Sequence, residues 1–556
     1  MAGRCRPGVG AGRDNDAVPA PAARRRRDLG QWFTPPAVVD LALALAGAGP
    51  GARVLDPACG DGAFLAGARR AGASQVVGIE LDPAHAAVAR ARVPGARVIA
   101  GDLFARPPAP FDVVAGNPPY VRAERLPAAA RARVRARLAA DWPDAPAAAL
   151  DRVVRRGDLA AACVMRALRF ARPDGGRVAL VVSSALVDAD YGDTLWAFVR
   201  RHAAVRAVVD APRERWFADA AVNAVIVVLE RGARDSRSTA LARLRVPTAR
   251  AAVPLGSLAT VADVRAGDDP RAWRALLTAP DAWFAFTAAA GDRLIALGEV
   301  ADVRRGATTG ANDVFYLPRA RAAALGIEPE ALVPLLKRPA DRIDVDPRAT
   351  PLVAVAVDPA RAARLPGARR YLASRREVAT RRTLRARDPW WALRVQRARL
   401  FFTKAYHDRF VQHRCAEPIA CDQRVYAVRP KPGVPAARLA AVLNSTWTAL
   451  AIESLGRASM GEGALEWTVA GAAALPVVDP RRISPAAATA LERVARRPIG
   501  PIADEVRRAD RAALDAAVFD HPDRAAWWTQ LADAVARRVG RPRAPAPRHD
   551  RAGRPR

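Results

Sequence analysis

The residues best suited to chemistry are Asn117-Pro118-Pro119-Tyr120, which follow the apolar run FDVVAG. An exocyclic amine conjugated to a ring is a poor nucleophile because its lone pair is delocalised. The Asn117 side-chain oxygen and the Pro118 carbonyl could accept from its two N–H groups and so release that lone pair. The two prolines stiffen the loop, and Tyr120 offers a planar face for stacking a base. Such a site would work mainly by positioning and electrostatics, since the amine loses its proton only after attack.

A second group of residues, in the upstream segment VLDPACGDGAFL, has the pattern of a nucleoside-binding turn. A buried strand is expected to end at Asp56. Ala58, Gly60 and Gly62 then let the backbone turn tightly and approach a ligand closely. A helix is expected to begin directly after this turn.

Two more carboxylates end the next two expected strands. Glu80, in GIELDP, can accept hydrogen bonds from both hydroxyls of a ribose, and Asp102, in AGDLF, can accept from an adenine amino group. The chain has neither the GxGxxG spacing of dinucleotide enzymes after the first strand nor a Walker lysine. A ligand with one nucleoside and a charged thioether therefore fits better. Taken singly, each acid could instead only cap the end of its strand.

The elements that must position these residues are strands alternating with helices. Apolar runs at ARVLDPA, VVGIEL, RVIAGDL, FDVVAGN, RVALVVSSAL and AVIVVLE are separated by helical patterns such as VVDLALALA and PAHAAVARARV. This alternation predicts an α/β domain with a doubly wound mixed sheet over residues 29–235. Short loops after the strand ends would bring both motifs to one edge of the sheet.

The remaining parts of the chain differ in composition. Residues 1–28 are a basic tail and residues 541–556 a Pro/Arg-rich tail, and both are expected to be disordered. Residues 236–296 are irregular and are expected to bridge two domains. Residues 297–480 mix short strands and loops with aromatic residues and many arginines, which predicts an α+β domain. An Ala-rich helical part, residues 481–540, should follow it.

The overall charge indicates a polyanionic partner. The 556 residues include 88 basic and 56 acidic ones, a formal net charge of +32, which favours nucleic acid over the alternative of a solvated arginine-rich surface. Five cysteines are too few for a disulfide framework, and Cys415 and Cys421 lack a second ligand pair, so no metal is expected. Without a signal core or a long apolar run, we expect no membrane association and a cytoplasmic location.

Together the motifs resemble those of the gamma-class adenine-N6 DNA methyltransferases of type II restriction–modification systems, including the Taq-type enzymes. The order is the family's: Phe-Thr-Pro-Pro at residues 33–36, the donor loop, NPPY and a C-terminal DNA-recognition domain. The resemblance implies the Rossmann-like fold of class I S-adenosylmethionine-dependent methyltransferases for residues 29–235. It also implies S-adenosylmethionine as methyl donor and double-stranded DNA as substrate, with the target adenine flipped out of the duplex.

The resemblance assigns further residues to the donor site. Thr34 should lie near the methionine part of the donor, and the Leu103 backbone beside Asp102 at the donor adenine. Pro119 should pack against the donor. Asp158, in RGDLAAACV, should open a helix that lines the donor pocket.

The resemblance also assigns residues that should contact DNA. Phe217, in WFADAAVNAVIVVLE, should pack on the flipped base, with Trp216 as second choice. The segment RRGATTGANDVFYL resembles the start of the family's recognition domains. Its residues Arg304, Arg305 and Asn312 could reach phosphates or base edges, although each could also be a solvated or turn-forming residue.

Two other functions remain open. An RNA or protein-glutamine methyltransferase could use the same NPPY site, but the long C-terminal half argues against it. A DNA-binding module with a degenerate core is disfavoured by the intact set of acids and Asn117. The chain has no Pro-Cys nucleophile for ring-carbon methylation. No nuclease segment is recognisable, so we expect any cognate restriction endonuclease to be encoded separately.

Overall fold

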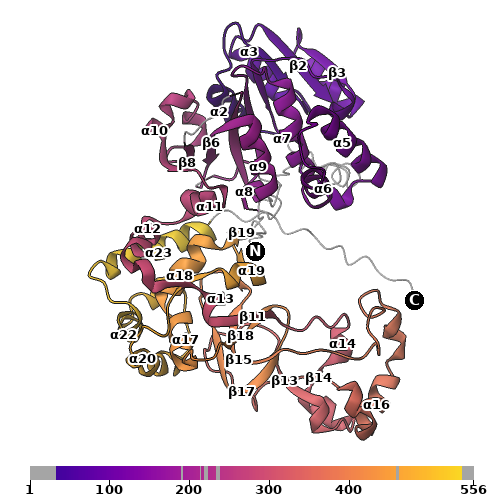
Figure 1. The fold of residues 1–556 in the computed structure, drawn as a ribbon. Coiled ribbons are helices and arrows are strands. Elements are labelled where there is room, and N and C mark those ends of the chain that lie inside the picture. The colour runs from indigo at the N-terminus through magenta and orange to yellow at the C-terminus, as the bar shows by residue number, and fades with distance from the viewer. Residues whose placement is uncertain are drawn as a thin grey trace, which may run out of the picture. The chain divides into compact units, whose positions relative to one another are not determined.

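The computed structural model describes residues 33–540 except 189–191, 213, 218–222, 233–237 and 459–462. The chain divides into two compact units, Met1–Arg271 and Ala272–Arg556 (Figure 1). The tails expected at residues 1–28 and 541–556 lie outside the described residues. Within the described ranges, no helix is long and apolar enough to cross a bilayer.

A nine-stranded sheet organises the first unit, in the order β3-β2-β1-β4-β5-β7-β6-β8-β9. The strands β3 to β5 in this order run parallel, while β7 is antiparallel to both its neighbours. The predicted doubly wound mixed sheet is therefore confirmed. Its first seven strands are β1 (Arg53–Asp56), β2 (Gln75–Glu80), β3 (Arg97–Ala100), β4 (Val113–Gly116), β5 (Arg177–Ser183), β6 (Ala203–Asp210) and β7 (Ala224–Arg231).

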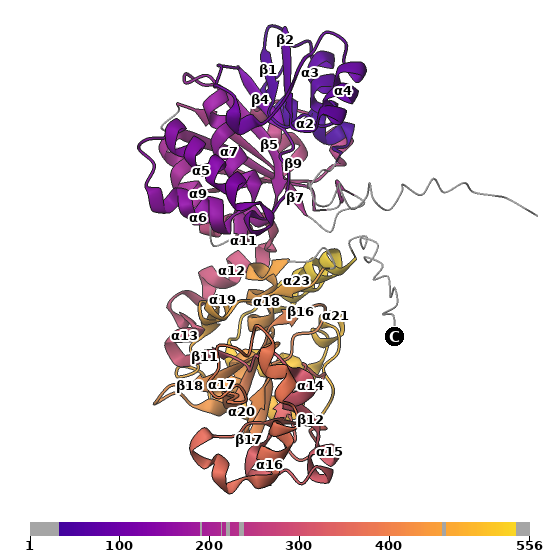
Figure 2. The same ribbon diagram turned by 90° about the vertical axis from the view of Figure 1, so that its right-hand side faces the viewer.

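Helices cover both faces of this sheet, which explains the continuous apolar runs of its central strands. Figure 2 shows α3 and α4 on one side of the strands and α5, α7 and α9 on the other. The helices of the first unit are α2 (Pro36–Ala46), α3 (Ala63–Arg70), α4 (Pro83–Arg92), α5 (Ala128–Asp141), α6 (Ala147–Arg156), α7 (Leu159–Phe170), α8 (Ala185–Asp188), α9 (Gly192–His202) and α10 (Leu258–Val261). The boundary between the units falls within α11 (Pro270–Thr278), most of which belongs to the second unit.

The segment 236–296, expected to bridge two domains, is divided between the two units. Its strand β8 (Thr239–Leu244) pairs in parallel with β6, and β9 (Ala262–Gly267) pairs antiparallel with β8, so both extend the sheet of the first unit. Its helix α12 (Asp281–Ala290) belongs to the second unit. The sequence pattern missed β9 because this edge strand is largely exposed and has no continuous apolar run.

A seven-stranded sheet, β11-β18-β15-β17-β13-β14-β12, organises the second unit. Figure 1 shows α14, α16 and β14 on one side of this unit and α17, α20 and α22 on the other. The strands of the large sheet are β11 (Ala301–Arg305), β12 (Tyr316–Pro318), β13 (Leu332–Leu336), β14 (Leu352–Val355), β15 (Arg397–Thr403), β17 (His413–Cys421) and β18 (Val425–Pro430). Two small sheets join β10 (Leu294–Ala296) to β21 (Pro476–Val478), and β16 (Ala405–Tyr406) through β20 (Leu465–Glu466) to β19 (Arg457–Ala458).

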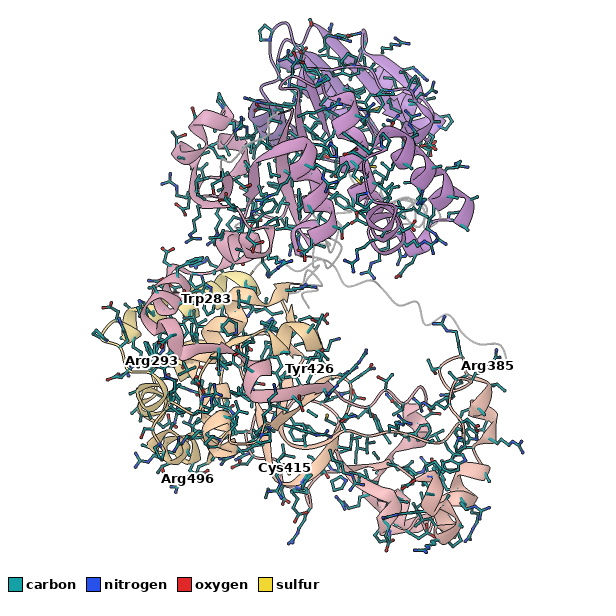
Figure 3. All side chains as sticks on the ribbon, viewed as in Figure 1. Trp283, Arg293, Arg385, Cys415, Tyr426 and Arg496 are labelled. Carbon is teal, nitrogen blue, oxygen red and sulfur yellow. The ribbon has the colours of Figure 1, made fainter. Side chains whose placement is uncertain are left out.

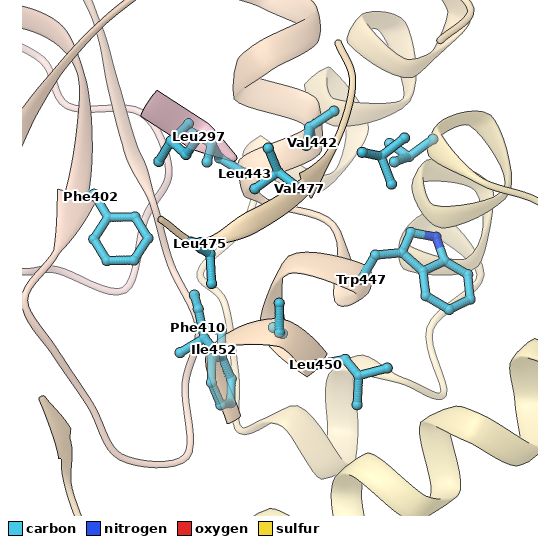
Figure 4. Packing of buried hydrophobic residues seen from close by; sticks show 14 of the residues in the cluster. Leu297, Phe402, Phe410, Val442, Leu443, Trp447, Leu450, Ile452, Leu475 and Val477 are labelled. Carbon is cyan, nitrogen blue, oxygen red and sulfur yellow. The ribbon is translucent and has the colours of Figure 1, made fainter. Parts of the chain in front are cut away.

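The helices expected at residues 481–540 share one core with the part of the chain before them. Trp447 lies fully buried in this core (Figure 4). Its ring stacks on Phe286 at 4.9 Å and meets Trp527 edge-on at 6.0 Å. The C-terminal helices therefore complete this domain. The remaining helices of the second unit are α13 (Leu297–Val300), α14 (Asn312–Phe315), α15 (Arg319–Ala324), α16 (Pro366–Ala373), α17 (Ala436–Leu443), α18 (Thr446–Leu455), α19 (Val469–Ala473), α20 (Ala486–Ala495), α21 (Ile502–Glu505), α22 (Ala509–Val518) and α23 (Arg524–Val539).

Candidate active site

The first carboxylate of the site, Asp56, ends β1 and is only 2% exposed. Its Oδ1 accepts a hydrogen bond from the Ala58 N–H at 3.0 Å. Burial raises the pKa of Asp56 to about 8, the Ala58 N–H opposes this shift, and the nearby charges of Glu80 and Asp61 add to it. The neighbouring strand approaches so closely that a Cβ on Gly116 would lie 2.4 Å from this Oδ1, which explains the glycine there.

The two glycines of the turn after β1, Gly60 and Gly62, have different roles. Gly60 has a φ of +51°, and it lines a cavity in which an added Cβ would meet no protein atom within 4 Å. Gly62 has a φ of +85° and stands before the first residue of α3, where a Cβ would lie 3.2 Å from Ala89 of α4. Gly60 therefore leaves room for a ligand, whereas Gly62 lets α3 begin and pack against α4.

The other two carboxylates are oriented by backbone N–H groups. Glu80 accepts from the Gly60 N–H through Oε2 and from the Asp82 N–H through Oε1, both at 2.8 Å. Asp102 accepts from the Phe104 N–H at 2.9 Å and caps the short helix η1 (Leu103–Ala105). Because an ionised carboxylate can accept about four hydrogen bonds, both groups keep capacity for a ligand.

These elements enclose a cavity of about 430 Å³ at the carboxyl edge of the sheet. This size is typical of pockets for small ligands. Asp158 does not line it. Its side chain accepts from the Ala161 N–H at 3.1 Å and caps α7, while Leu159 and Cys163 of that helix face the cavity. The predicted residues that do line it are Thr34, Asp56, Ala58, Gly60, Glu80, Asp102, Leu103, Asn117 and Pro119.

Apolar side chains at this cavity were missed from the sequence. Leu81, directly after Glu80, is 65% exposed, and Phe33 is 45% exposed with its ring 6.2 Å from that of His85. Within the described ranges only five large apolar side chains are exposed, and two of them are at this one cavity. A planar ligand bound there would cover them. The position of Leu81 next to a strand-end acid was the available signal.

The buried ion pair of Arg166 and Asp141 lies next to η1 and holds it by hydrogen bonds. Arg166 of α7 is completely buried and donates to the Leu103 carbonyl at 3.3 Å, to Asp141 Oδ2 at 2.6 Å and to the Arg106 carbonyl. Burial lowers the pKa of this guanidinium to about 10, and the Asp141 carboxylate opposes the shift. Sequence reasoning missed Arg166 because it is one charged residue in an otherwise apolar helix face.

The acceptor motif begins where β4 ends. Asn117 Nδ2 donates to Thr34 Oγ1 at 3.1 Å, so Thr34 both lines the cavity and sets the orientation of the Asn117 amide. Pro118 is buried, and Pro119 lines the cavity beside Asn117. The acceptor loop and the carboxylates thus face one common space.

Two aromatic rings, Tyr120 of the motif and Phe217, contact each other at this loop. The Tyr120 hydroxyl donates to the Val181 carbonyl at 3.1 Å, and its ring meets Phe217 edge-on with centroids 6.4 Å apart. Burial raises the pKa of Tyr120 well above its ordinary value, so the phenol stays neutral. Trp216 points elsewhere, since its Nε1 donates to Thr248 Oγ1 at 2.9 Å. The geometry therefore favours Phe217 over Trp216 as the ring beside the acceptor loop.

Three of the residues predicted to contact DNA, Arg304, Arg305 and Asn312, lie in the second unit. Arg304 and Arg305 are exposed on β11, and Arg305 donates to Gln423 Oε1 at 2.8 Å. Asn312 begins α14, and its Oδ1 accepts from the Thr309 hydroxyl.

The two cysteines considered as metal ligands are both buried in a cluster of apolar side chains, as Cys415 and Cys421 of β17. The part of the chain that the structure describes has no group of three or more side chains able to hold a metal ion.

Both units match known families. Residues 20–243 match the N-6 DNA Methylase family, and residues 271–512 match the C-terminal domain of the Type II methyltransferase M.Eco57I. By this match the first unit is an N-6 DNA methylase domain. The family predicted from its motifs is thereby confirmed, and the unit with the cavity is the methylase domain.

Individual relatives match parts of this methylase. It is 42% identical over 102 residues to the Type II methyltransferase M.TthHB8I of Thermus thermophilus, which is 18% of this chain and 23% of the relative. It is 31% identical over 98 residues to the Type II methyltransferase M.CvrRI of Paramecium bursaria Chlorella virus XZ-6E, 17% of this chain and 26% of the relative. The methylase thus spans about a quarter of the length of the curated relatives it matches.

A solved structure shares the fold of the methylase over both units. It is that of the Type IIL restriction–modification enzyme MmeI in complex with DNA, with a TM-score of 0.52 and 14% sequence identity. The similarity covers 91% of this chain and 72% of MmeI. The predicted class I S-adenosylmethionine-dependent methyltransferase fold, with an added C-terminal domain, is confirmed.

Proposed function

We propose that the methylase transfers a methyl group from S-adenosylmethionine to the N6 amine of an adenine in double-stranded DNA. One observation carries this proposal: Asn117 and Pro119 line the same cavity as Glu80 and Asp102. A methyl donor held by the carboxylates would thus lie beside the loop that is suited to an amine. The match to an N-6 methylase family supports the same acceptor.

The cavity suits a cationic nucleoside. Its described lining carries five carboxyl groups and one arginine, Arg133. Glu80 is placed to accept from ribose hydroxyls, and the exposed side chains of Leu81 and Phe33 can cover a base. When bound, S-adenosylmethionine supplies an electrophilic methyl group on a sulfonium. The five carboxyl groups belong to Asp56, Asp61, Glu80, Asp82 and Asp102.

The acceptor residues of the chain position the amine. Asn117 Oδ1 and the Pro118 carbonyl accept from its two N–H groups and hold them out of the plane of the base. Thr34 fixes the Asn117 amide for this task. Tyr120 and Phe217 hold the ring of the base, and Tyr120, being neutral, does not act as a proton acceptor. The amine releases its proton after the new N–C bond has formed.

The adenine can reach this loop only after it leaves the base stack. The net charge of +32 favours the polyanionic duplex. We further propose that the methylase is the modification arm of a restriction–modification system. Specificity would come from the second unit, which matches the C-terminal domain of a Type II methyltransferase.

The test is transfer of a radiolabelled methyl group from S-adenosylmethionine to unmethylated duplex DNA, with RNA and protein substrates in parallel. Hydrolysis of the product should place the label in N6-methyladenine. Asn117→Ala should abolish transfer while calorimetry still detects donor binding, which controls for folding. Label found only in RNA or in protein glutamine would refute the proposed substrate, and full activity in Asn117→Ala would refute the proposed site.

A further inference from the structure

An arginine-rich segment of the second unit is not used by the proposed active site. Residues 359–399 contain thirteen arginines but only two acidic residues, Glu377 and Asp388. The segment therefore carries a net charge of +11, about a third of the charge of the whole chain. Eleven of these arginines are exposed, so most of this charge faces solvent.

The backbone of this segment is held in place by contacts to the start of the domain. Arg381 forms a two-pronged ion pair with Asp313, at 3.1 and 3.4 Å. Trp390 meets the fully buried Phe315 edge-on at 6.1 Å. Leu384, which lies between Arg381 and Trp390 in the sequence, is fully buried as well. The backbone that carries the exposed arginines is therefore already ordered. This reduces the conformational entropy lost when the arginines bind a ligand.

Further contacts join the segment to the glycine-rich loop at residues 306–311. Gly310 has a φ of +76°, and a Cβ there would lie 2.4 Å from Thr383 Oγ1. Arg387 donates to the Thr308 carbonyl. Thr308, Arg387, Arg394 and Arg397 also line one cavity of about 780 Å³. The loop and the arginine-rich segment therefore form one continuous surface.

The charges of this surface are poorly neutralised by the protein. In the described part of the chain, the side chains of Arg376, Arg382 and Arg394 make no hydrogen bond or ion pair. Elsewhere in the same unit, arginines are paired with acids, as Arg414 is with Asp344 and Glu492. Exposed guanidinium groups without an acidic partner match phosphate in both charge and fork geometry.

We propose that the surface formed by residues 306–311 and 359–399 binds the phosphate backbone of duplex DNA and so holds the substrate of the methylase. This inference rests on the proposed function and assigns its DNA contact to particular residues. The contacts predicted for Arg305 and Asn312 remain predictions beside it, and both side chains also have hydrogen-bond partners within the protein.

The test compares arginines on two sides of the second unit. Arg382→Ala, Arg385→Ala and Arg394→Ala alter the proposed surface, and Arg496→Ala, directly after α20, is the matched control. Figure 3 shows Arg385 and Arg496 at opposite sides of this unit. Binding of a fluorescent duplex of about 30 base pairs is followed by anisotropy from about 50 to about 200 mM salt. Methyl transfer to DNA is measured with the same proteins.

Each surface variant should lose one phosphate contact. The slope of log K against log salt should become less steep by about 0.9. The loss of DNA affinity relative to the unsubstituted protein should therefore be about 3.5-fold smaller at about 200 mM salt than at about 50 mM. The KM for DNA should rise at unchanged kcat, and Arg496→Ala should behave as the unsubstituted protein. If the unsubstituted protein binds and methylates duplex DNA and all three surface variants behave like Arg496→Ala, the proposed surface is refuted and the proposed function is not. If the unsubstituted protein binds no duplex, or only RNA, the surface and the proposed function both fail.

Discussion

Replacing Arg166 by methionine should weaken the first unit and its donor site together. The side chain donates to two carbonyls of the η1 region, those of Leu103 and Arg106, and pairs with buried Asp141. Methionine keeps an unbranched apolar stem in place of the first part of the arginine side chain but makes none of these bonds. Arg137 remains at 2.9 Å from Asp141, with its own side chain 28% exposed, so the carboxylate keeps one partner.

The expected cost follows from this arrangement. Removing one partner of a buried ion pair typically costs about 3–5 kcal/mol, and the remaining Arg137 places the value near the lower end. In a unit of this size each kcal/mol lowers the unfolding temperature by about 2–4 °C. The thermal transition of the methylase domain should therefore fall by roughly 6–12 °C.

Thermal unfolding and calorimetric titration with S-adenosylmethionine measure the two effects. Because Leu103 and Phe104 line the cavity, donor affinity should fall about tenfold, equivalent to about 1.4 kcal/mol. Adding Asp141→Leu should restore much of the stability, since an apolar pair often replaces a buried ion pair at little cost. An unchanged transition in Arg166→Met, or a double variant less stable than the single one, would refute this reasoning.

Three further predictions concern residues of the same unit. Because burial raises the pKa of Asp56 to about 8, the folded state binds more protons than the unfolded chain from about pH 4 to 8. The free energy of unfolding should therefore fall as pH rises through this window. Urea unfolding should show a weaker dependence of this free energy on pH in Asp56→Asn. Gly116→Ala should cost about 1–3 kcal/mol by forcing Asp56 aside, and should lower kcat by moving the adjoining acceptor loop, as thermal unfolding and methyl transfer would report. Phe217→Ala should lower kcat with donor binding unchanged, whereas Trp216→Phe should lose only about 1 kcal/mol of stability with its hydrogen bond to Thr248; equal kinetic effects of these two variants would contradict their assignment.

The sheet could be predicted where its strands are buried on both faces. The runs that became β1 to β5 and β7 are continuously apolar, because helices cover both sides. The strand β6 was missed, since it follows α9 without an intervening turn residue. The strand β9 lies at the edge of the sheet, where part of the surface faces water and the apolar signal weakens.

The sequence by itself determined the chemistry that the methylase domain offers. Acids at the ends of successive strands and a rigid Asn-Pro-Pro-Tyr loop carry their meaning in short segments, because parallel strands bring their carboxyl ends to one edge. From this the fold could be predicted before any coordinates, together with the edge of the sheet at which the cavity lies.

Only the tertiary structure decided which side chains support that chemistry. The bond from Asn117 to Thr34, the burial of Arg166 beneath Leu103 and the separation of Trp216 from Phe217 join residues far apart in the chain, or depend on which way neighbouring side chains turn. The arginine-rich segment likewise meets the glycine-rich loop across about seventy residues. Local patterns constrain backbone geometry, whereas such contacts depend on how distant segments pack, and no single segment encodes them.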